Sequence, residues 1–407
     1  MTSLSARTIH PFPARMAPEI ALNGLSGLRG RSVVLDPMSG SGTVLRQAAV
    51  LGHRAIGFDL DPLAVLISRV CVRPMREADV ANACEVVLDI AKGLSPERIR
   101  LPWIDDDEET KNFVEYWFGE TQAKDLRRLA FVLHNLADAA GRRFRPAILD
   151  ILRIALSRII ITKEQCASLA RDTSHSRPHR VTTSSDYRVF DGFERSVAQV
   201  QNRLLQSQVD VRVNVKVGDA RKTNLRGHSV DAVITSPPYL NAIDYMRGHR
   251  LALVWLGFRL SELRTVRSNS IGAERAPDTH TLNQGDLQQS PINISALTPR
   301  YRRIVERYAK DVQGITMEIA RVLRPGGLAI FVIGNSCLNG VFIRNAELLK
   351  QAAQSAGLNL IEESERDLPP QNRYLPISSG GALGKRMRTE TILTFAARRK
   401  TDRRRSS

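Results

Sequence analysis

Short apolar runs of the kind that form buried strands alternate with amphipathic segments along much of this chain. The runs lie at residues 32–35, 54–58, 211–217, 230–234, 328–333, 358–362 and 389–396. Apolar residues at helical spacing cover residues 44–51, 311–323 and 342–356. Strands that alternate with helices predict an α/β fold with a mostly parallel sheet.

A long block at residues 75–205 interrupts this alternation. Its apolar residues recur at helical spacing over residues 80–93, 112–140 and 147–162, and Trp103, Trp117 and Phe118 fit a helical core. We therefore expect a largely helical insertion in the α/β domain. The end of the block, residues 168–180, is polar, basic and rich in histidine, a composition typical of phosphate contacts but equally of a solvated loop.

Acidic residues follow three of the predicted strands where each strand ends: Asp36, Asp59 and Asp219. Ligands of open α/β sheets bind at that end of the strands. The first strand runs into a glycine-rich turn at residues 36–43, whose spacing matches neither of the phosphate-binding glycine patterns. Asp59 follows this turn by about 20 residues, the spacing at which an acid accepts hydrogen bonds from ribose hydroxyls. These features predict a nucleoside-containing ligand, and a plain α/β core with a helix-capping Asp is the alternative.

The run at residues 230–234 delivers Thr235, Ser236, Pro237, Pro238 and Tyr239 to the same edge of the predicted sheet. Each proline fixes φ and lacks a backbone N–H, so the turn is stiff and its carbonyl oxygens lack the usual nearby donors. Such a turn can present hydrogen-bond acceptors to a planar amino group, with the tyrosine ring as a stacking face. A rigid turn with a structural tyrosine would have the same sequence.

The composition indicates a basic protein of the reducing cytosol. The chain has 407 residues, 43% of them hydrophobic, and a net charge of +17, which favours a polyanionic partner, although a basic proteome or a basic tail would also produce it. Its four cysteines form no close pair, so we expect neither a disulfide framework nor a zinc site. No apolar run approaches the roughly 18 residues of a membrane helix, and residues 1–9 lack the apolar stretch of a signal peptide. We expect a cytoplasmic protein.

Together these motifs resemble the S-adenosylmethionine-dependent DNA amino-methyltransferases that modify cytosine N4 or adenine N6. The resemblance implies a Rossmann-like class I methyltransferase sheet, S-adenosylmethionine as cofactor and no metal. Residues 10–18 resemble the segment that packs over the cofactor in this family. Asp59 matches the ribose-binding acid, and Asp219 the acid that binds the adenine amino group. The implied cofactor-binding residues are Phe12, Asp36, Pro37, Ser39, Gly40, Gly42, Thr43, Asp59, Asp61 and Asp219, and the implied catalytic residues are Ser236, Pro237, Pro238 and Tyr239.

The resemblance also implies methylation of double-stranded DNA at a specific site, in the nucleoid, with a cognate restriction endonuclease as a candidate partner. Ser236 favours cytosine N4, because relatives that modify adenine mostly carry Asp or Asn at this position. Adenine N6 methylation, RNA base methylation, protein glutamine methylation and a non-enzymatic nucleic-acid-binding module are the alternatives.

The predicted domain organisation follows. Residues 1–74 form the N-terminal arm and the cofactor-binding half, residues 75–205 the helical insertion, residues 206–397 the catalytic half with a candidate recognition loop at 261–300, and residues 398–407 a basic tail. Thr235 follows Asp219 by only 16 residues, a gap too short for a recognition domain. Target recognition is therefore expected in residues 75–205, in residues 240–305, or in both.

Overall fold

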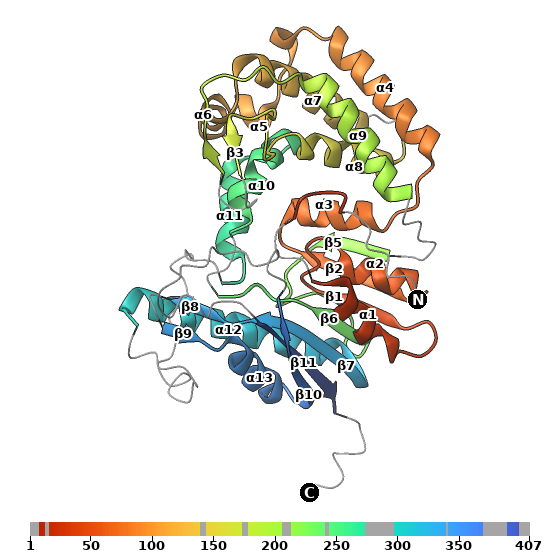
Figure 1. Ribbon diagram of the computed structural model, residues 1–407, viewed down its shortest axis with the longest axis vertical. Coiled ribbons are helices and arrows are strands. Elements are labelled where there is room, and N and C mark those ends of the chain that lie inside the picture. Colours follow the sequence, from red (N-terminus) through yellow and green to blue (C-terminus); the bar gives the residue numbers. More distant parts are fainter. Residues whose placement is uncertain are drawn as a thin grey trace, which may run out of the picture.

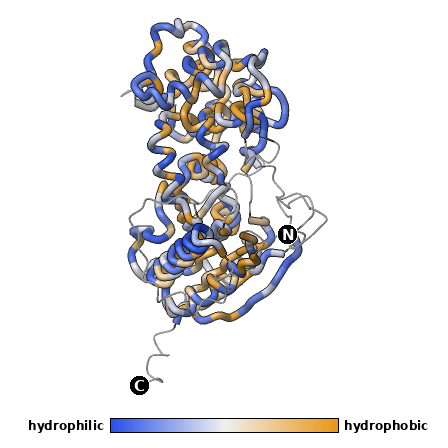
Figure 2. The backbone as a smooth tube through the Cα atoms, turned by 90° about the vertical axis from the view of Figure 1, so that its left-hand side faces the viewer, coloured by the Kyte–Doolittle hydropathy of each residue, from blue (hydrophilic) through white to orange (hydrophobic). Residues whose placement is uncertain are grey.

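Two parts are stacked in the protein: a sheet with helices on both faces, and a layer of helices beyond it (Figures 1 and 2). The computed structural model describes residues 8–12, 16–138, 144–172, 178–205, 213–240, 244–272, 297–338, 341–368 and 389–398.

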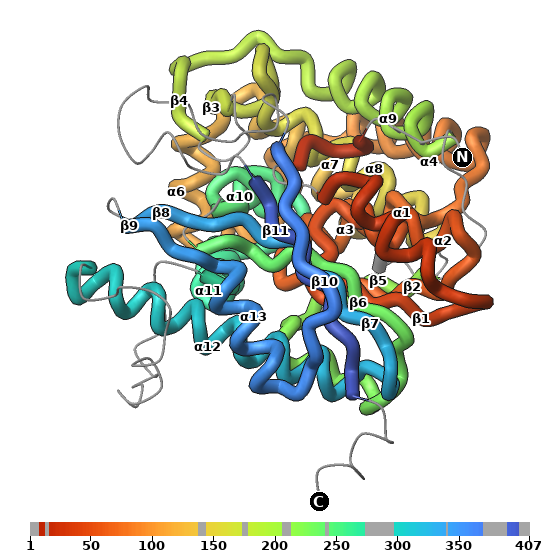
Figure 3. Tube along the Cα trace, turned by 60° about the horizontal axis from the view of Figure 1, so that its bottom comes forward, coloured from red at the N-terminus to blue at the C-terminus, as the bar shows by residue number. Residues whose placement is uncertain are grey.

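Within the described residues, the central sheet has seven strands in the order β10-β11-β7-β6-β1-β2-β5. Their bounds are β1 Val33–Asp36, β2 Arg54–Asp59, β5 Val213–Val217, β6 Val230–Thr235, β7 Leu323–Gly334, β10 Leu358–Asp367 and β11 Thr389–Ala397. Pairing is parallel from β5 through β7, whereas β11 pairs antiparallel with both β7 and β10. The labelled strands can be followed along the Cα trace in Figure 3. The order reverses between β1 and β6, so the ends of these two adjacent strands form the switch point where such sheets bind ligands. The predicted Rossmann-like sheet is confirmed.

Helices cover both faces of the sheet because successive side chains of a buried strand point to opposite sides. Val34 and Ile234 belong to the core under α1, α2 and α3, whereas the adjacent Leu35 and Val233 belong to the core under α12 and α13. The bounds of these helices are α1 Pro18–Ser26, α2 Thr43–Val50, α3 Pro62–Cys71, α12 Pro299–Val322 and α13 Asn345–Ser355.

The predicted insertion is largely helical, and its core continues onto the outer face of α3. Its elements are α4 Glu77–Gly93, η1 Pro96–Arg98, α5 Pro102–Asp105, α6 Glu108–Trp117, α7 Glu120–Asp138, α8 Pro146–Arg158, β3 Ala170–Arg171, β4 His179–Arg180 and α9 Val189–Leu205. The segment after the Ser-Pro-Pro-Tyr turn joins the same layer, as α10 Met246–Leu253, η2 Val254–Leu256 and α11 Leu260–Asn269 (Figure 1). Trp255 of η2 is buried edge-on against Phe118, with ring centroids 5.0 Å apart. The helical layer is thus built from two separate parts of the sequence.

The expectation of irregular chain over residues 261–300 is wrong for its first part, which lies in α11. Leu260 and Leu263 are buried on one side of this helix, and the Leu260 N–H donates to Thr110 Oγ1 at 3.0 Å. Glu262 accepts the Arg259 N–H and caps the helix. Residues 273–296 of the predicted loop lie outside the described residues.

Three smaller predictions also need correction. The helix expected over residues 112–140 is two helices, because the chain turns extended at Phe118 between α6 and α7. The helix expected from residue 342 begins at Asn345, because β9 (Val341–Ile343) pairs with β8 (Ser336–Leu338) as a hairpin. The basic stretch 168–180 contains a short antiparallel pair, β3 with β4, and residues 173–177 between the two strands lie outside the described residues.

Candidate cofactor and catalytic site

The glycine-rich turn after β1 packs closely against α3 and β2. Gly40 and Gly42 have φ values of +47° and +79°, a region that favours glycine. A Cβ on Gly42 would lie 3.0 Å from the Ser68 Cα of α3, so only glycine allows this close approach. The Ser39 N–H donates to the Phe58 carbonyl of β2 at 2.8 Å. The turn therefore has a fixed shape at the carboxyl ends of β1 and β2. Of the other predicted residues here, Pro37 is buried and Thr43 begins α2.

Asp36 lies at this switch point, and Asp59 lies beside it at the end of β2. Asp36 is 3% exposed and accepts the Thr235 hydroxyl at 2.8 Å and the Met38 N–H at 3.2 Å. Asp59 accepts the Gly40 N–H at 2.9 Å and the Asp61 N–H at 3.0 Å. The contact between Thr235 and Asp36 joins the catalytic turn to the cofactor half of the sequence, 199 residues away.

Burial raises the pKa of Asp36 to about 7, against two hydrogen bonds that lower it, and the charge of Asp59 raises it further. Burial also raises the pKa of Asp59 to about 6, with the charge of Asp61 adding to the effect. Poorly solvated carboxylates of this kind are stabilised by a ligand that brings positive charge or hydroxyl donors. The amino, ribose and sulfonium groups of S-adenosylmethionine would stabilise these carboxylates in this way, whereas a negatively charged phosphate would not.

The N-terminal arm reaches this turn, as its resemblance implies. A Cβ on Gly40 would lie 3.2 Å from Phe12 Cε1, so the Phe12 ring covers the turn. The ring also stacks on Tyr245 with centroids 5.3 Å apart, and lies tilted against His249 of α10 at 5.6 Å. Residues 13–15 of the arm lie outside the described residues.

Asp61 connects the cofactor turn to α10. Its Oδ1 accepts the Leu63 N–H at 2.9 Å and caps α3, and its Oδ2 lies 2.5 Å from His249 Nδ1. Burial opposes ionisation, but the charge and hydrogen bond of His249 together with the α3 N–H groups lower the pKa of Asp61. Neither His249 nor Tyr245 was predicted, because no motif marks α10 and its partners lie far away in the sequence.

The Ser-Pro-Pro-Tyr turn is held by the neighbouring strands β7 and β11. The Ser236 hydroxyl donates to the Val332 carbonyl at 2.9 Å. The Tyr239 hydroxyl donates to Glu390 Oε1 at 3.0 Å, and a Cβ on Gly334 would lie 2.8 Å from its ring. Burial and the charge of Glu390 raise the pKa of Tyr239 well above its ordinary value. The tyrosine is therefore a neutral donor with a fixed ring plane. Val332 and Glu390 carried no sequence signal beyond membership of predicted strands, and Gly334 lies one residue beyond the predicted strand at 328–333.

The third acid, Asp219, lies just after β5 and is engaged by a neighbouring arginine. Its Oδ2 accepts from Arg221 Nη2 at 2.7 Å. The preceding Gly218 N–H donates to the Asp59 carbonyl at 3.0 Å, which holds this segment beside the end of β2. The structure thus places Asp36, Asp59 and Asp219 along one edge of the sheet, at the ends of β1, β2 and β5.

The described residues contain no group of three or more His, Cys, Asp or Glu side chains that could hold a metal ion. Within them, no helix is both long enough and apolar enough to cross a membrane.

Comparison with known proteins identifies methyltransferases. No protein-family model matches the chain. It is 24% identical over 396 residues to the Type II methyltransferase M.BsoBI of Geobacillus stearothermophilus, covering 83% of this chain and 75% of that protein. It is 18% identical over 395 residues to the Type II methyltransferase M.MvaI of Kocuria varians, covering 90% and 84%.

A solved S-adenosylmethionine-dependent methyltransferase from Methanosarcina mazei covers 95% of this chain and 100% of its own, with 8% identity and a TM-score of 0.33, too low to carry an argument. The sequence relatives confirm the predicted resemblance to S-adenosylmethionine-dependent DNA methyltransferases. The strand order and the parallel pairing of the sheet confirm the predicted class I fold.

Proposed function

We propose that this chain is a site-specific DNA methyltransferase that transfers the methyl group of S-adenosylmethionine to the exocyclic amino group of a flipped base, cytosine N4 in double-stranded DNA. One observation supports the proposal most directly: the Ser236 hydroxyl donates its proton to the Val332 carbonyl at 2.9 Å. Toward a target amine, Ser236 Oγ then acts as an acceptor, directly after β6 and next to Thr235, whose hydroxyl contacts Asp36.

The target amine needs such acceptors because its lone pair is delocalised into the base ring, which makes it a poor nucleophile. Ser236 Oγ and the Pro237 carbonyl can accept its two hydrogens and favour a pyramidal nitrogen whose lone pair faces the methyl donor. Bound S-adenosylmethionine supplies the activated methyl group on its sulfonium. No general base is needed before transfer, since the product amine loses its proton afterwards. Positioning supplies most of the acceleration, and well-oriented groups contribute roughly 7–11 kcal/mol.

The carboxylates at the strand ends would hold the cofactor. Asp59 accepts its ribose hydroxyls, Asp219 its adenine amino group, and Asp36 faces its positively charged end. The Phe12 ring, stacked on Tyr245 and lying over Gly40, would cover it from the N-terminal side.

The base must leave the duplex to reach this edge, at a cost of a few kcal/mol. Stacking on Tyr239 would return about 1–3 kcal/mol. The bond to Glu390 and the close approach to Gly334 support this role, because they fix the ring plane in advance. Phosphate contacts from a chain of net charge +17 would provide the remaining affinity, in a salt-dependent manner.

Target recognition is assigned to the helical layer, residues 75–205, together with α10 and α11. These helices pack as one layer beside the catalytic turn, which supports a shared role. The similarity to Type II methyltransferases supports a cognate restriction endonuclease as partner and action in the nucleoid.

The test is mass spectrometry of nucleosides from the DNA of cells that express the chain, against cells that carry the empty vector. We expect N4-methylcytosine only with the chain. N6-methyladenine instead would change the target base and keep the reaction class. Modified nucleosides in RNA alone would overturn the DNA assignment.

A further inference from the structure

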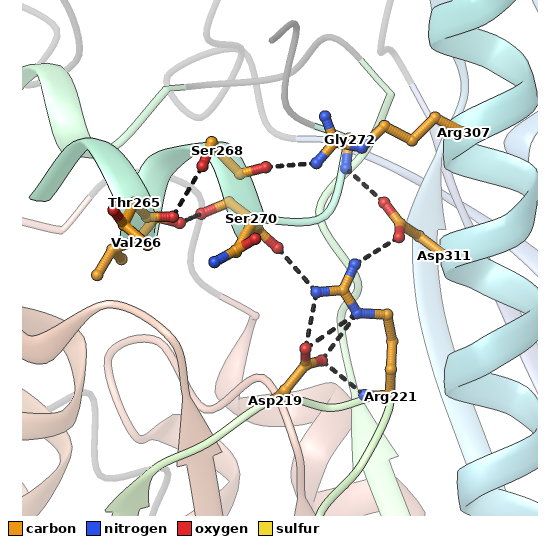
Figure 4. A network of polar contacts seen from close by, with 10 residues as sticks. Asp219, Arg221, Thr265, Val266, Ser268, Ser270, Gly272, Arg307 and Asp311 are labelled. Atoms are coloured by element: carbon orange, nitrogen blue, oxygen red, sulfur yellow. Dashed lines mark hydrogen bonds and ion pairs between the residues drawn. The ribbon is translucent and has the colours of Figure 1, made fainter. Parts of the chain in front are cut away.

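Arg221 takes up most of the hydrogen-bonding capacity of Asp219 (Figure 4). Asp219 Oδ1 accepts the Arg221 backbone N–H and the Nε–H, both at 2.9 Å, and Oδ2 accepts the Nη2–H at 2.7 Å. The Nε–H is shared with Oδ2 at 3.1 Å. A carboxylate offers about four acceptor positions, and these three N–H groups make four contacts with them. The longest contact, from Nε–H to Oδ2, is the one that a further donor can replace, because this N–H also has its 2.9 Å bond to Oδ1. A ligand amino group at the end of β5 would therefore meet Asp219 in an orientation that Arg221 sets.

The other side of the same guanidinium is bound by two helices. Arg221 Nη1 donates to Asp311 Oδ1 of α12 at 2.5 Å, and Nη2 donates to the carbonyl of Asn269, the last residue of α11, at 2.9 Å. Asp311 Oδ2 in turn accepts the Gly272 N–H at 3.4 Å. Figure 4 shows the guanidinium between the two aspartates, with the end of α11 beside it. Arg221 thus links the end of β5 to both helices.

The side chain of Arg221 also has a fitted place on α12. A Cβ on Gly314 would lie 3.3 Å from Arg221 Cγ, so glycine at this position leaves room for the aliphatic part of the side chain. The side chain of Asp311 is only 8% exposed. Burial lowers the pKa of Arg221, but its bonds to Asp219 and the charges of Asp311 and Asp219 outweigh this and raise it. A guanidinium held charged and packed on both sides has little freedom to leave Asp219.

We propose that Arg221 is a positioning residue for the adenine end of the cofactor. It orients Asp219 so that one position on Oδ2 receives the 6-amino group, and it anchors that contact to α11 and α12. The proposal rests on the proposed role of Asp219. A residue that only stabilised the fold would weaken all cofactor analogues alike, whereas a positioning residue changes the preference between an amino and an oxo group at this position.

The test is calorimetry with S-adenosylhomocysteine and with its analogue that carries hypoxanthine, whose 6-oxo group replaces the amino group. The native protein should prefer the adenine ligand by about tenfold or more, because the oxo group cannot donate to a carboxylate. In Arg221→Gln the preference should shrink to within about threefold as affinity for the adenine ligand falls. Arg221→Lys keeps the charge without the fork of donors and should give an intermediate preference. A folded Arg221→Gln protein with the native preference would overturn the proposal.

Two further variants separate the ways in which this test can fail. Arg321→Gln is the matched control, because Arg321 of α12 likewise joins an acidic side chain to a backbone carbonyl: it binds Glu318 at 2.7 Å and donates to the Leu225 carbonyl at 2.8 Å. This variant should keep the native preference. If Asp219→Asn also keeps the native preference for the adenine ligand, the assignment of Asp219 to the adenine amino group fails. If Asp219→Asn abolishes this preference and Arg221→Gln does not, only the proposed role of Arg221 fails. Should Arg221→Gln not fold, the preference of Arg221→Lys decides. No methyl transfer is measured, so the result does not depend on DNA being the substrate.

Discussion

Replacing Ser236 by alanine removes one hydroxyl and tests the catalytic proposal at a single atom. The hydroxyl donates to the carbonyl of Val332, a residue that is 1% exposed, and it also interacts with Tyr239. Loss of one such bond costs about 0.5–1.5 kcal/mol of the free energy of unfolding. The contact between Thr235 and Asp36 does not involve the lost atom, so we expect Ser236→Ala to fold with a slightly lower melting temperature.

The effect on methyl transfer should be much larger. Removing one preorganised hydrogen-bonding group at a reacting centre typically lowers turnover by about 10²–10³. Ser236 Oγ is proposed to act on the amine mainly in the transition state, so turnover should fall by this amount while the dissociation constant of the cofactor stays within about threefold. This separation of turnover from binding distinguishes an acceptor at the target base from a structural serine.

The assay is single-turnover transfer of a labelled methyl group to duplex DNA, with cofactor binding measured separately by calorimetry. Ser229→Ala is the matched control: Ser229 directly precedes β6 at its opposite end, and its hydroxyl donates to the Arg226 carbonyl at 2.5 Å. It loses the same kind of bond and should retain native turnover. The reasoning is refuted if Ser236→Ala loses no more turnover than Ser229→Ala, or if its cofactor affinity falls as far as its turnover.

Three further predictions use other parts of the site. Burial raises the pKa of Asp36 to about 7 and of Asp59 to about 6, so the folded protein binds more protons than the unfolded chain between about pH 4 and 7. The contribution of these two groups to the free energy of unfolding should therefore increase as the pH falls through this range. In denaturant titrations, Asp36→Asn should show a smaller increase than the native protein. Tyr239→Phe and Glu390→Gln should each lower methyl transfer only a few-fold in steady-state assays, because both keep the aromatic ring. Tyr239→Ala removes the ring and should lower methyl transfer far more. Equal losses in all three variants would argue against a stacking role. Truncation after Ala397 removes residues 398–407, which include six basic residues and lie almost entirely outside the described residues. It should flatten the salt dependence of non-specific DNA affinity in fluorescence titrations, while methylation at low salt is retained. An unchanged slope would exclude the tail from the DNA contact.

The parts of the fold that could be predicted are those set by local sequence. The strand before Asp36 and the strand before Ser236 are short apolar runs bounded by turn residues, and the parallel sheet then requires their ends to meet at one edge. The observed bond between Thr235 and Asp36 is the result of this requirement.

The parts that could not be predicted depend on contacts between distant segments. The apolar positions of α11 are few. Leu260 is buried in the core of the helical layer, and its N–H donates to Thr110 of α6, 150 positions earlier in the sequence. Glu390 reaches Tyr239 because β11 lies between β7 and β10, an order that the strand pattern does not specify. Arg221 stands two residues from Asp219 in the sequence, but its partner Asp311 lies 90 residues away.

The most direct test of the proposed function is transfer of labelled methyl groups from S-adenosylmethionine by the purified protein, with duplex DNA, transfer RNA and ribosomal RNA offered in parallel. We predict label in duplex DNA, recovered as N4-methylcytosine, and its loss with Ser236→Ala. Label in RNA with none in DNA would contradict the account.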